Sequence, residues 1–197
     1  MAILRFVDDE KENVAERKAS LRAYMKELRA GIDNKDVKAE QATRNAIEYL
    51  EKKRKENGGD IVFVYQSFST EMDTDMLISQ LQEKGFRVYC PKIENKVMYA
   101  VALGEDFTIS KFGIREPIGD KLLTSPHYVI TPLLAVDKQG NRLGYGKGYY
   151  DGYFARYPNA LRIGYAFDRQ VIRQVPTEHT DIQLQTLITE TDVWEIE

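Results

Sequence analysis

The sequence is poor in the residues from which redox and transition-metal sites are built. Among 197 residues it has one cysteine, Cys90, and two histidines, His127 and His179. A single cysteine excludes an internal disulfide, and three such residues are too few for a zinc-ligand cluster at the usual spacings. We therefore expect any cofactor to be an ion with oxygen ligands or a bound nucleotide.

Long apolar runs are also missing. Stretches such as residues 61–65 are far shorter than the roughly 20 apolar residues that span a bilayer. Residues 1–10 become acidic at Asp8-Asp9-Glu10, where a secretory signal would need a longer apolar core. These features predict a cytoplasmic protein that makes no membrane contact.

Positive charge is not in excess. The chain has 28 Lys+Arg against 31 Asp+Glu, a net charge of −3, which excludes a protein that coats DNA. A basic stretch over residues 11–56 leaves a non-catalytic nucleotide- or RNA-binding module as one hypothesis. Residues 57–197 are net acidic and lack an extended basic stripe, so we expect no nucleic-acid partner.

The pattern of apolar residues predicts the fold class. Val14, Leu21, Met25, Leu28 and Ile32 recur at helical spacing, and a second helix is expected over about 35–56. From residue 60 strands and helices alternate. The expected strands are 61–65, 86–90, 97–103, 128–131, 162–167 and 186–189, and the expected helices are 73–84, 147–156 and 168–174. This order predicts a single domain over residues 1–197, a three-layer α/β/α sandwich with a mostly parallel sheet and a helical N-terminal segment, 11–56, packed on it.

Residues 144–148 carry a glycine at every second position, a spacing that neither a strand nor a helix favours. Such glycines allow left-handed backbone conformations in which successive N–H groups converge on an anion ahead of a helix. The stretch predicts a phosphate-binding loop, with Lys147 as a point charge, Arg142 as a forked donor and Asp151 as an oxygen ligand for Mg²⁺. An ordinary glycine-rich turn is the alternative.

The loop is neither of two common nucleotide-binding motifs. A Walker A loop needs glycine where Asn141 stands and Ser or Thr where Gly148 stands. The glycines also lack the spacing of the dinucleotide-binding motif. Phosphate binding by this loop therefore has to be of another type.

Taken with its flanks, the loop resembles a known family. The stretch from Pro132 to Asp151, which contains Arg142-Leu143-Gly144-Tyr145-Gly146-Lys147-Gly148-Tyr149-Tyr150-Asp151, is similar to the signature of the 5-formyltetrahydrofolate cyclo-ligases, also called methenyltetrahydrofolate synthetases. Segments 18–22, 65–74, 112–117 and 175–190 agree with that family in order and spacing. The resemblance covers about residues 14–190.

The resemblance implies an enzyme that uses ATP and Mg²⁺. Such an enzyme cyclises 5-formyltetrahydrofolate to 5,10-methenyltetrahydrofolate and releases ADP and phosphate, through phosphorylation of the formyl oxygen and attack by N10. Phosphoryl transfer asks a protein mainly for positioning and charge neutralisation, which these residues can supply. We expect a monomer whose partners are ATP and this folate, with or without a polyglutamate tail.

The resemblance also assigns roles to residues. Catalysis is assigned to Lys147 and Arg142. Nucleotide binding is assigned to Lys18, Arg22, Arg142, Gly144, Tyr145, Gly146, Lys147, Gly148, Tyr149 and Tyr150. Folate binding is assigned to Gln66, Glu71, Tyr149 and Tyr150, and metal binding to Asp151 and Asp181.

Several assignments have a simpler structural alternative. Lys18 and Arg22 also fit a solvated helix face, Glu71 fits a helix N-terminus, and Tyr149 with Tyr150 fits a packed core. In the C-terminal segment Gln185 stands where the family commonly has a second aspartate beyond Asp181.

A different enzyme class is a further alternative. A sugar-phosphate isomerase or an acyl-CoA transferase on a similar sandwich would hold a substrate phosphate in the glycine loop. The pair Lys18 and Arg22, together with Asp151, favours a nucleotide with a metal over a simple sugar phosphate.

Overall fold

The computed structural model describes residues 13–110 and 113–196. Its helices are α1 (Val14–Ala30), α2 (Lys35–Asn57), α3 (Asp75–Glu83) and α4 (Tyr149–Arg156), with a 3₁₀ turn, η1 (Asp168–Gln170). The acidic stretch at residues 8–10 and Phe112 of the 112–117 segment lie outside the described residues.

Local chemistry explains where these helices begin and end. The side chain of Asn13 accepts a hydrogen bond from the Glu16 amide at 3.0 Å, and Glu16 Oε2 accepts one from the Asn13 amide at 3.2 Å, a reciprocal cap for α1. Gly58, with φ of 72°, ends α2 in a conformation that favours glycine. The helix boundaries expected near residues 31 and 57 are therefore confirmed.

A mostly parallel sheet forms the centre of the molecule. Its strand order is β11-β10-β9-β6-β1-β2-β3, with bounds β1 (Ile61–Val64), β2 (Arg87–Glu94), β3 (Val97–Ala102), β6 (Tyr128–Thr131), β9 (Leu161–Tyr165), β10 (Thr186–Ile188) and β11 (Val193–Glu195). The strands from β10 to β2 run parallel, and the edge strands β11 and β3 are antiparallel to their neighbours. The strands β1 and β6 are buried along their whole length, as expected for a sheet covered on both faces.

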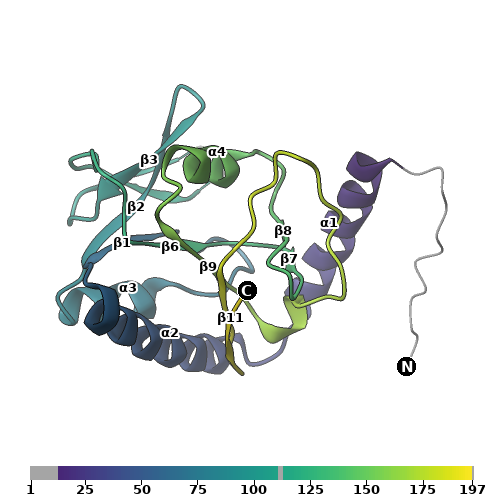
Figure 1. The fold of residues 1–197 in the computed structure, drawn as a ribbon, viewed down its shortest axis with the longest axis horizontal. Helices are drawn as coiled ribbons and strands as arrows, with labels where there is room; N and C mark the ends of the chain where they lie inside the picture. Colours follow the sequence, from purple (N-terminus) through teal and green to yellow (C-terminus); the bar gives the residue numbers. More distant parts are fainter. Residues whose placement is uncertain (1–12, 111–112, 197) are drawn as a thin grey trace.

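Helices cover both faces of this sheet. Figure 1 shows α2 and α3 along one face, α4 across the other and α1 beyond the end of the sheet, beside β7 (Ala135–Val136) and β8 (Arg142–Leu143). One apolar cluster joins α2 and α3 to the sheet, and a second joins Phe63 and Val129 to Tyr153 and Phe154 of α4. The predicted α/β sandwich with a mostly parallel sheet is confirmed.

A third apolar cluster attaches α1 to the rest of the chain. Leu21 and Met25 pack with Leu134, Ala135 and Leu143, which lie in and beside the β7–β8 hairpin. The N-terminal helix is thus packed against the segment that carries the glycine motif. Among the described residues, no helix combines the length and the apolar character that crossing a bilayer requires.

The structure differs from the sequence prediction in short elements. The helix expected over 168–174 is wrong, because only η1 forms there. The hairpins β4 (Phe107–Ile109) with β5 (Arg115–Pro117) and β7 with β8 were not predicted, nor was β11. Strands of two or three residues are too short to show a period of two in the sequence.

Candidate functional site

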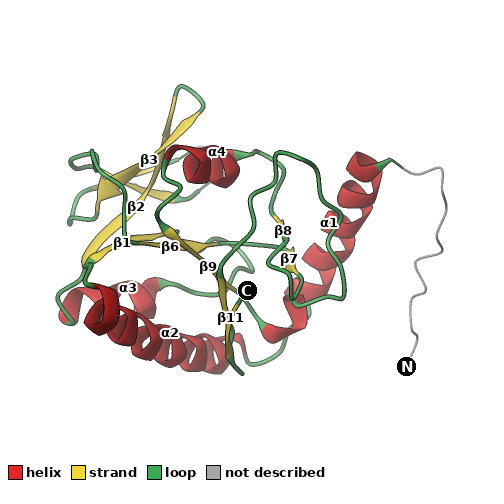
Figure 2. Ribbon diagram, in the orientation of Figure 1, coloured by secondary structure: helices red, strands yellow, loops and turns green. Residues whose placement is uncertain are grey.

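Two long connections begin at neighbouring strands in the middle of the sheet. From β1 the chain continues to α3 and β2, whereas from β6 it continues to α4 and β9 on the opposite side. The strand order therefore reverses between β1 and β6, and α/β sheets bind ligands outside the carboxyl ends of the strands at such a point. Residues 65–74 and 132–148 follow these two ends, and Figure 2 shows loops gathered beside β7, β8 and α1.

The glycine loop, residues 144–148, leads from β8 into α4. Gly146 and Gly148 have φ of 85° and 68°, in the left-handed region that favours glycine. Gly148 precedes α4 and no side chain caps that helix, so its first amides lack a side-chain acceptor. The loop thus has the backbone form that the sequence predicted for binding an anion ahead of a helix.

A buried carboxylate fixes the base of the glycine loop. Asp137 is fully buried, and its Oδ1 accepts hydrogen bonds from the amides of Gln139 and Asn141 at 3.1 and 3.0 Å. Its Oδ2 accepts from Asn141 Nδ2 at 3.0 Å and from the Val175 amide at 2.9 Å. Four donors compensate for the desolvation of this carboxylate and fix the chain immediately before Arg142.

The two predicted nucleotide-binding cations of α1 reach the loops around this site. Arg22 Nε donates to the Gly144 carbonyl at 3.0 Å, and a Cβ added at Gly146 would lie 3.1 Å from Arg22 Cζ. Lys18 is 5% exposed, and its Nζ lies 2.6 Å from Asp181 Oδ2 and 2.8 Å from Glu178 Oε2. The alternative of a solvated helix face is therefore wrong for Lys18.

Desolvation and ion pairing act in opposite directions on Lys18. Burial lowers the pKa of its ammonium group, but the hydrogen bonds and charges of Asp181 and Glu178 outweigh burial and raise that pKa above its ordinary value. Lys18 therefore stays charged throughout the physiological range.

Arg142 lies beneath the glycine loop. Its Nη2 donates to both carboxylate oxygens of Asp151 at 3.0 Å, and its side chain is 6% exposed. Nε and Nη1 are buried without a hydrogen-bond partner, while the guanidinium lies 5.7 and 5.5 Å from the ring centres of Tyr150 and Phe154. Burial lowers the pKa of Arg142, and the charge of Asp151 opposes this effect. Two nitrogens of the guanidinium, which together carry three N–H groups, thus remain without an acceptor.

The other predicted residues of the motif differ in exposure. Lys147 is exposed at the loop tip, whereas Tyr149 and Tyr150 are half-buried against the apolar cluster of α4. The rings of Tyr150 and Phe63 stack with centres 6.3 Å apart, and burial raises the pKa of Tyr150 well above its ordinary value. Both tyrosines therefore pack against the apolar core, which was the structural alternative to their predicted role in ligand binding.

The predicted folate residues follow β1. Gln66 borders a cavity of about 530 Å³, together with residues of α3, the 103–105 segment and Arg115, and its Oε1 is buried without a partner. Glu71 Oε2 accepts a hydrogen bond from the Phe68 amide at 2.9 Å. Burial raises the pKa of Glu71, while hydrogen bonding from Phe68 and Tyr145 and the charge of Arg29 act in the opposite direction.

The two predicted metal ligands lie in separate ion pairs. Asp151 pairs with Arg142 and also accepts from the Ile182 amide at 3.2 Å, and Asp181 pairs with Lys18. Gln185 Oε1 accepts from the Arg162 amide. Within the described part of the chain, no group of three or more His, Cys, Asp or Glu forms a site for a metal ion.

Sequence reasoning missed Arg29 and Glu178. Arg29 is 3% exposed and donates hydrogen bonds to Thr70, Leu133 and Tyr145. Lys18, Leu21, Met25 and Arg29 are the buried residues of α1 and recur at spacings of three and four. A charged residue in phase with the apolar stripe was therefore the signal, and the predicted inward position Leu28 is only half-buried.

Comparison with known proteins identifies the family. Residues 14–190 match the model of the 5-formyltetrahydrofolate cyclo-ligase family. This chain belongs to that family. A 5-formyltetrahydrofolate cyclo-ligase of Escherichia coli K12 is 35% identical over 145 residues, which cover 68% of this chain and 80% of that protein. One from Haemophilus influenzae is 30% identical over 182 residues, covering 86% and 95%.

Solved structures of cyclo-ligases share the fold. The 5,10-methenyltetrahydrofolate synthetase of Aquifex aeolicus superposes with a TM-score of 0.75 at 25% identity, covering 91% of this chain and 92% of that one. The Mycoplasma pneumoniae synthetase has a TM-score of 0.71 at 20% identity, covering 88% and 98%. Membership in a family of ligases favours this activity over the isomerase and acyl-CoA transferase alternatives.

The glycine loop generates a first prediction. Gly146→Ala places a Cβ where φ is 85° and Arg22 is 3.1 Å away, so we expect ATP affinity to fall about 5- to 30-fold, the equivalent of the roughly 1–2 kcal/mol cost of such backbone strain. Isothermal titration with a non-hydrolysable ATP analogue measures this change.

Gly152→Ala is the matched control. Gly152 lies inside α4 with nothing within 4 Å of an added Cβ, so this variant should bind the nucleotide normally. Its free energy of unfolding should rise by about 1 kcal/mol, because alanine favours a helix more than glycine does, and its melting temperature should rise as well. Equal nucleotide affinities for the two variants would contradict a role of the loop backbone in binding.

Proposed function

We propose that this protein is a 5-formyltetrahydrofolate cyclo-ligase in which the glycine loop and α1 hold ATP and the segment after β1 holds the folate. The observation that carries the proposal is the buried Arg142 guanidinium, with two nitrogens unpartnered, beneath a glycine loop that leads into an uncapped helix. Such donors bind a phosphate, whose oxygens accept their hydrogen bonds.

The nucleotide side is supported by the placement of the cations. Arg22 lies against Gly146, Lys147 stands exposed between the two left-handed glycines, and Lys18 lies at the 178–181 loop. Together these three cations neutralise the charge on the phosphate oxygens of ATP, and none of them forms a covalent bond to the phosphate. When bound, ATP supplies a phosphoryl group to the formyl oxygen, which turns that oxygen into a leaving group.

The folate side is supported by unsatisfied and desolvated acceptors. Gln66 borders the 530 Å³ cavity, its buried Oε1 lacks a donor, and the Glu71 carboxylate is partly desolvated. Pterin rings carry N–H donors that fit both groups. Leaving a buried acceptor without a donor costs about 1–3 kcal/mol, which a bound ring would recover.

The task of the protein in this reaction is positioning. The N-formyl group is an amide and therefore a poor electrophile, and ring closure needs N10 held against the formyl carbon while the oxygen is expelled. Fixed geometry of this kind contributes to rate without any acid or base from the protein. Packed strands on both sides of the β1–β6 boundary give the two loops such fixed starting points.

Mg²⁺ fits the site as a companion of ATP. Asp151 Oδ2 accepts a single hydrogen bond, from Arg142, and so retains a lone pair for an ion. One or two carboxylates with phosphates and water are the usual Mg²⁺ environment. We infer that Asp151 is the main protein ligand and that Asp181 lies at the edge of the site.

We also propose that the enzyme acts in the cytoplasm as a monomer.

Turnover is the direct test of the proposed function. Purified protein should convert 5-formyltetrahydrofolate to the methenyl form, followed by its absorbance, only when ATP and Mg²⁺ are present. Lys147→Ala should lower kcat roughly a hundredfold, the scale of losing one preorganised electrostatic donor. Because Lys147 is exposed, the melting temperature of the Lys147→Ala variant should equal that of wild type.

Absence of turnover with all three components would reject the proposed activity. Turnover of Lys147→Ala within about threefold of wild type would instead remove only this lysine from the catalytic group.

Glu71→Gln tests the folate side. The substitution keeps the size of the side chain but weakens its acceptance of pterin N–H bonds, so the folate KM should rise while the ATP KM stays the same. Because the pKa of Glu71 is raised above 4.5, the carboxylate is lost as pH falls through that raised value, and the wild-type folate KM should increase there. The Gln variant should lack this pH dependence.

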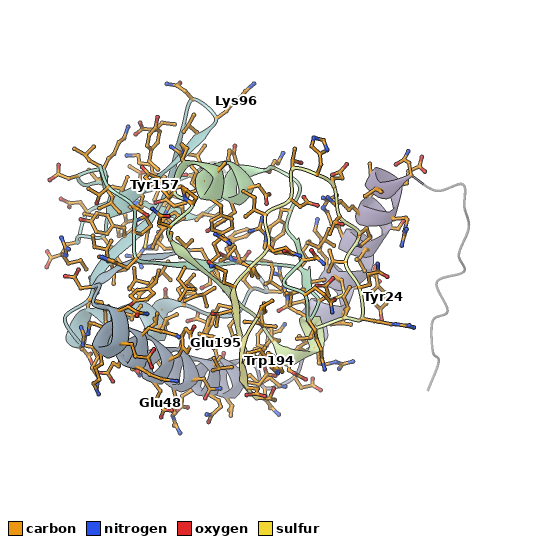
Figure 3. The ribbon with its side chains drawn as sticks, viewed as in Figure 1. Tyr24, Glu48, Lys96, Tyr157, Trp194 and Glu195 are labelled. Carbon is orange, nitrogen blue, oxygen red and sulfur yellow. The ribbon has the colours of Figure 1, made fainter. Side chains whose placement is uncertain are left out.

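Glu48→Gln is the control for this experiment. Glu48 is exposed on the outer face of α2, and Figure 3 shows it at the edge of the molecule. Equal increases of both KM values in Glu71→Gln would indicate a structural role instead.

A Mg²⁺ titration tests the metal assignment. Asp151→Asn should raise the Mg²⁺ concentration for half-maximal rate more than Asp181→Asn does, because a carboxylate beside the ion acts more strongly than a screened one. Both variants are titrated at saturating ATP and folate. A larger shift for Asp181→Asn would reverse the assignment, and no shift for either would remove both carboxylates from the metal site.

A further inference from the structure

Arg29 is a buried charge held by neutral partners. Its Nε donates to Thr70 Oγ1 at 3.0 Å, its Nη1 to the Leu133 carbonyl at 3.3 Å and its Nη2 to the Tyr145 hydroxyl at 2.5 Å. The residue is 3% exposed. All three acceptors are uncharged oxygens, so the guanidinium is desolvated without the compensation of a contacting carboxylate.

The three acceptors belong to the two loops that the proposed reaction uses. Thr70 directly precedes Glu71 in the segment after β1, Leu133 follows β6, and Tyr145 lies inside the glycine loop. Arg29 therefore joins the two connections that begin on either side of the β1–β6 boundary. Its own helix, α1, also carries Lys18 and Arg22, so one rigid element contacts the 178–181 segment, the glycine loop and the segment after β1.

An arginine is an expensive residue for packing alone. Its side chain continues a stripe that Leu21 and Met25 fill with apolar groups, and a similar apolar residue would be buried there at lower cost. The planar guanidinium donates from three nitrogens in fixed directions, whereas an ammonium donates from a single nitrogen and an apolar group has no donor.

Tyr145 is the point at which this contact can control the glycine loop. Glycines flank it on both sides, so the loop backbone has little stiffness of its own. Its hydroxyl accepts the hydrogen bond from Arg29, and its ring centre lies 5.6 Å from Arg29 Cζ. Hydrogen bonding from the same hydroxyl lowers the pKa of the Glu71 carboxyl group. The phenol thus lies between the glycine loop and the Glu71 segment.

We propose that Arg29 is a positioning residue which, through Tyr145 and Thr70, holds the glycine loop and the Glu71 segment in one relative position and so couples nucleotide binding to folate binding. This inference rests on the proposed function, since it assigns ATP to the first loop and folate to the second. Each ligand that orders its own loop then reduces the cost of ordering the other.

Equilibrium binding measures the coupling. The dissociation constant of 5-formyltetrahydrofolate is determined by titration calorimetry with and without a saturating non-hydrolysable ATP analogue and Mg²⁺. In wild type the analogue should tighten folate binding about fivefold or more, the usual range of such coupling. In Tyr145→Phe, which loses only the hydroxyl, the effect should fall to about twofold or less.

Arg29→Lys and the double variant complete a thermodynamic cycle. Arg29→Lys keeps the charge but loses the three-way donor, and it should lose the same coupling as Tyr145→Phe. The double variant should lose no more coupling than either single variant, because both variants remove the same Arg29–Tyr145 contact. Tyr24→Phe is the matched control, since Tyr24 is exposed on the outer side of α1 and should leave the coupling unchanged (Figure 3).

The possible results separate this inference from the proposed function. Absence of folate or nucleotide binding in wild type would overturn both. Normal binding of each ligand with the same coupling in wild type and Tyr145→Phe, or with no coupling in wild type, would overturn the role of Arg29 alone. If Arg29→Lys fails to fold, Tyr145→Phe still decides the result, because its hydroxyl contributes nothing to the apolar core.

Discussion

The burial of two cations on α1 is the constraint on which the site depends. Lys18 and Arg29 lie at the two ends of a stripe whose middle, Leu21 and Met25, is apolar. Apolar packing alone would allow the helix to slide or rotate at small cost, whereas a desolvated cation needs its acceptors at fixed positions. Asp181 and Glu178 supply them at one end, and Thr70, Leu133 and Tyr145 at the other. The helix can therefore dock in one register, and in that register it brings three separate loops together.

The sheet and α1 contribute differently to the geometry of these loops. Parallel strands buried on both faces fix where each loop begins, but they do not fix the path of a chain with glycine at every second position. That path is fixed from outside the sheet, by Asp137 at the base of the loop, by Arg22 on the Gly144 carbonyl and by Arg29 on Tyr145. Stability comes from the apolar clusters around the sheet, whereas the shape of the site comes from a small number of buried polar groups. Such groups favour one geometry while adding little net stability.

The features that could be predicted from the sequence are those encoded over short distances. The continuous apolar run at 61–65 indicates a strand buried on both faces, and the glycines of 144–148 indicate an anion-binding turn, because each depends only on neighbouring residues. The β7–β8 hairpin could not be predicted, because its strands have only two residues and the Asp137 side chain fixes the turn between them through hydrogen bonds from Asn141. In the sequence, Asp137 resembles an ordinary turn residue. Arg29 was missed for a related reason: on a helix rich in Lys and Arg a single buried arginine is distinguished only by its partners, which lie 41 to 116 residues away.

Charge balance explains why the predicted phosphate ligands and metal ligands contact one another. Lys18 pairs with Asp181, and Arg142 pairs with Asp151, so two of the cations expected to meet a phosphate are matched by the two carboxylates expected near Mg²⁺. A phosphate bound at the cation alone, or a Mg²⁺ bound at the carboxylate alone, would add an unbalanced charge to a neutral and partly buried pair. A phosphate and a Mg²⁺ that arrived together would add charges of opposite sign at neighbouring positions and would leave each pair balanced. With ATP and Mg²⁺ held as proposed, the arrangement of this site would favour the nucleotide with its metal over either one alone, through the same desolvation cost that fixes α1 in place.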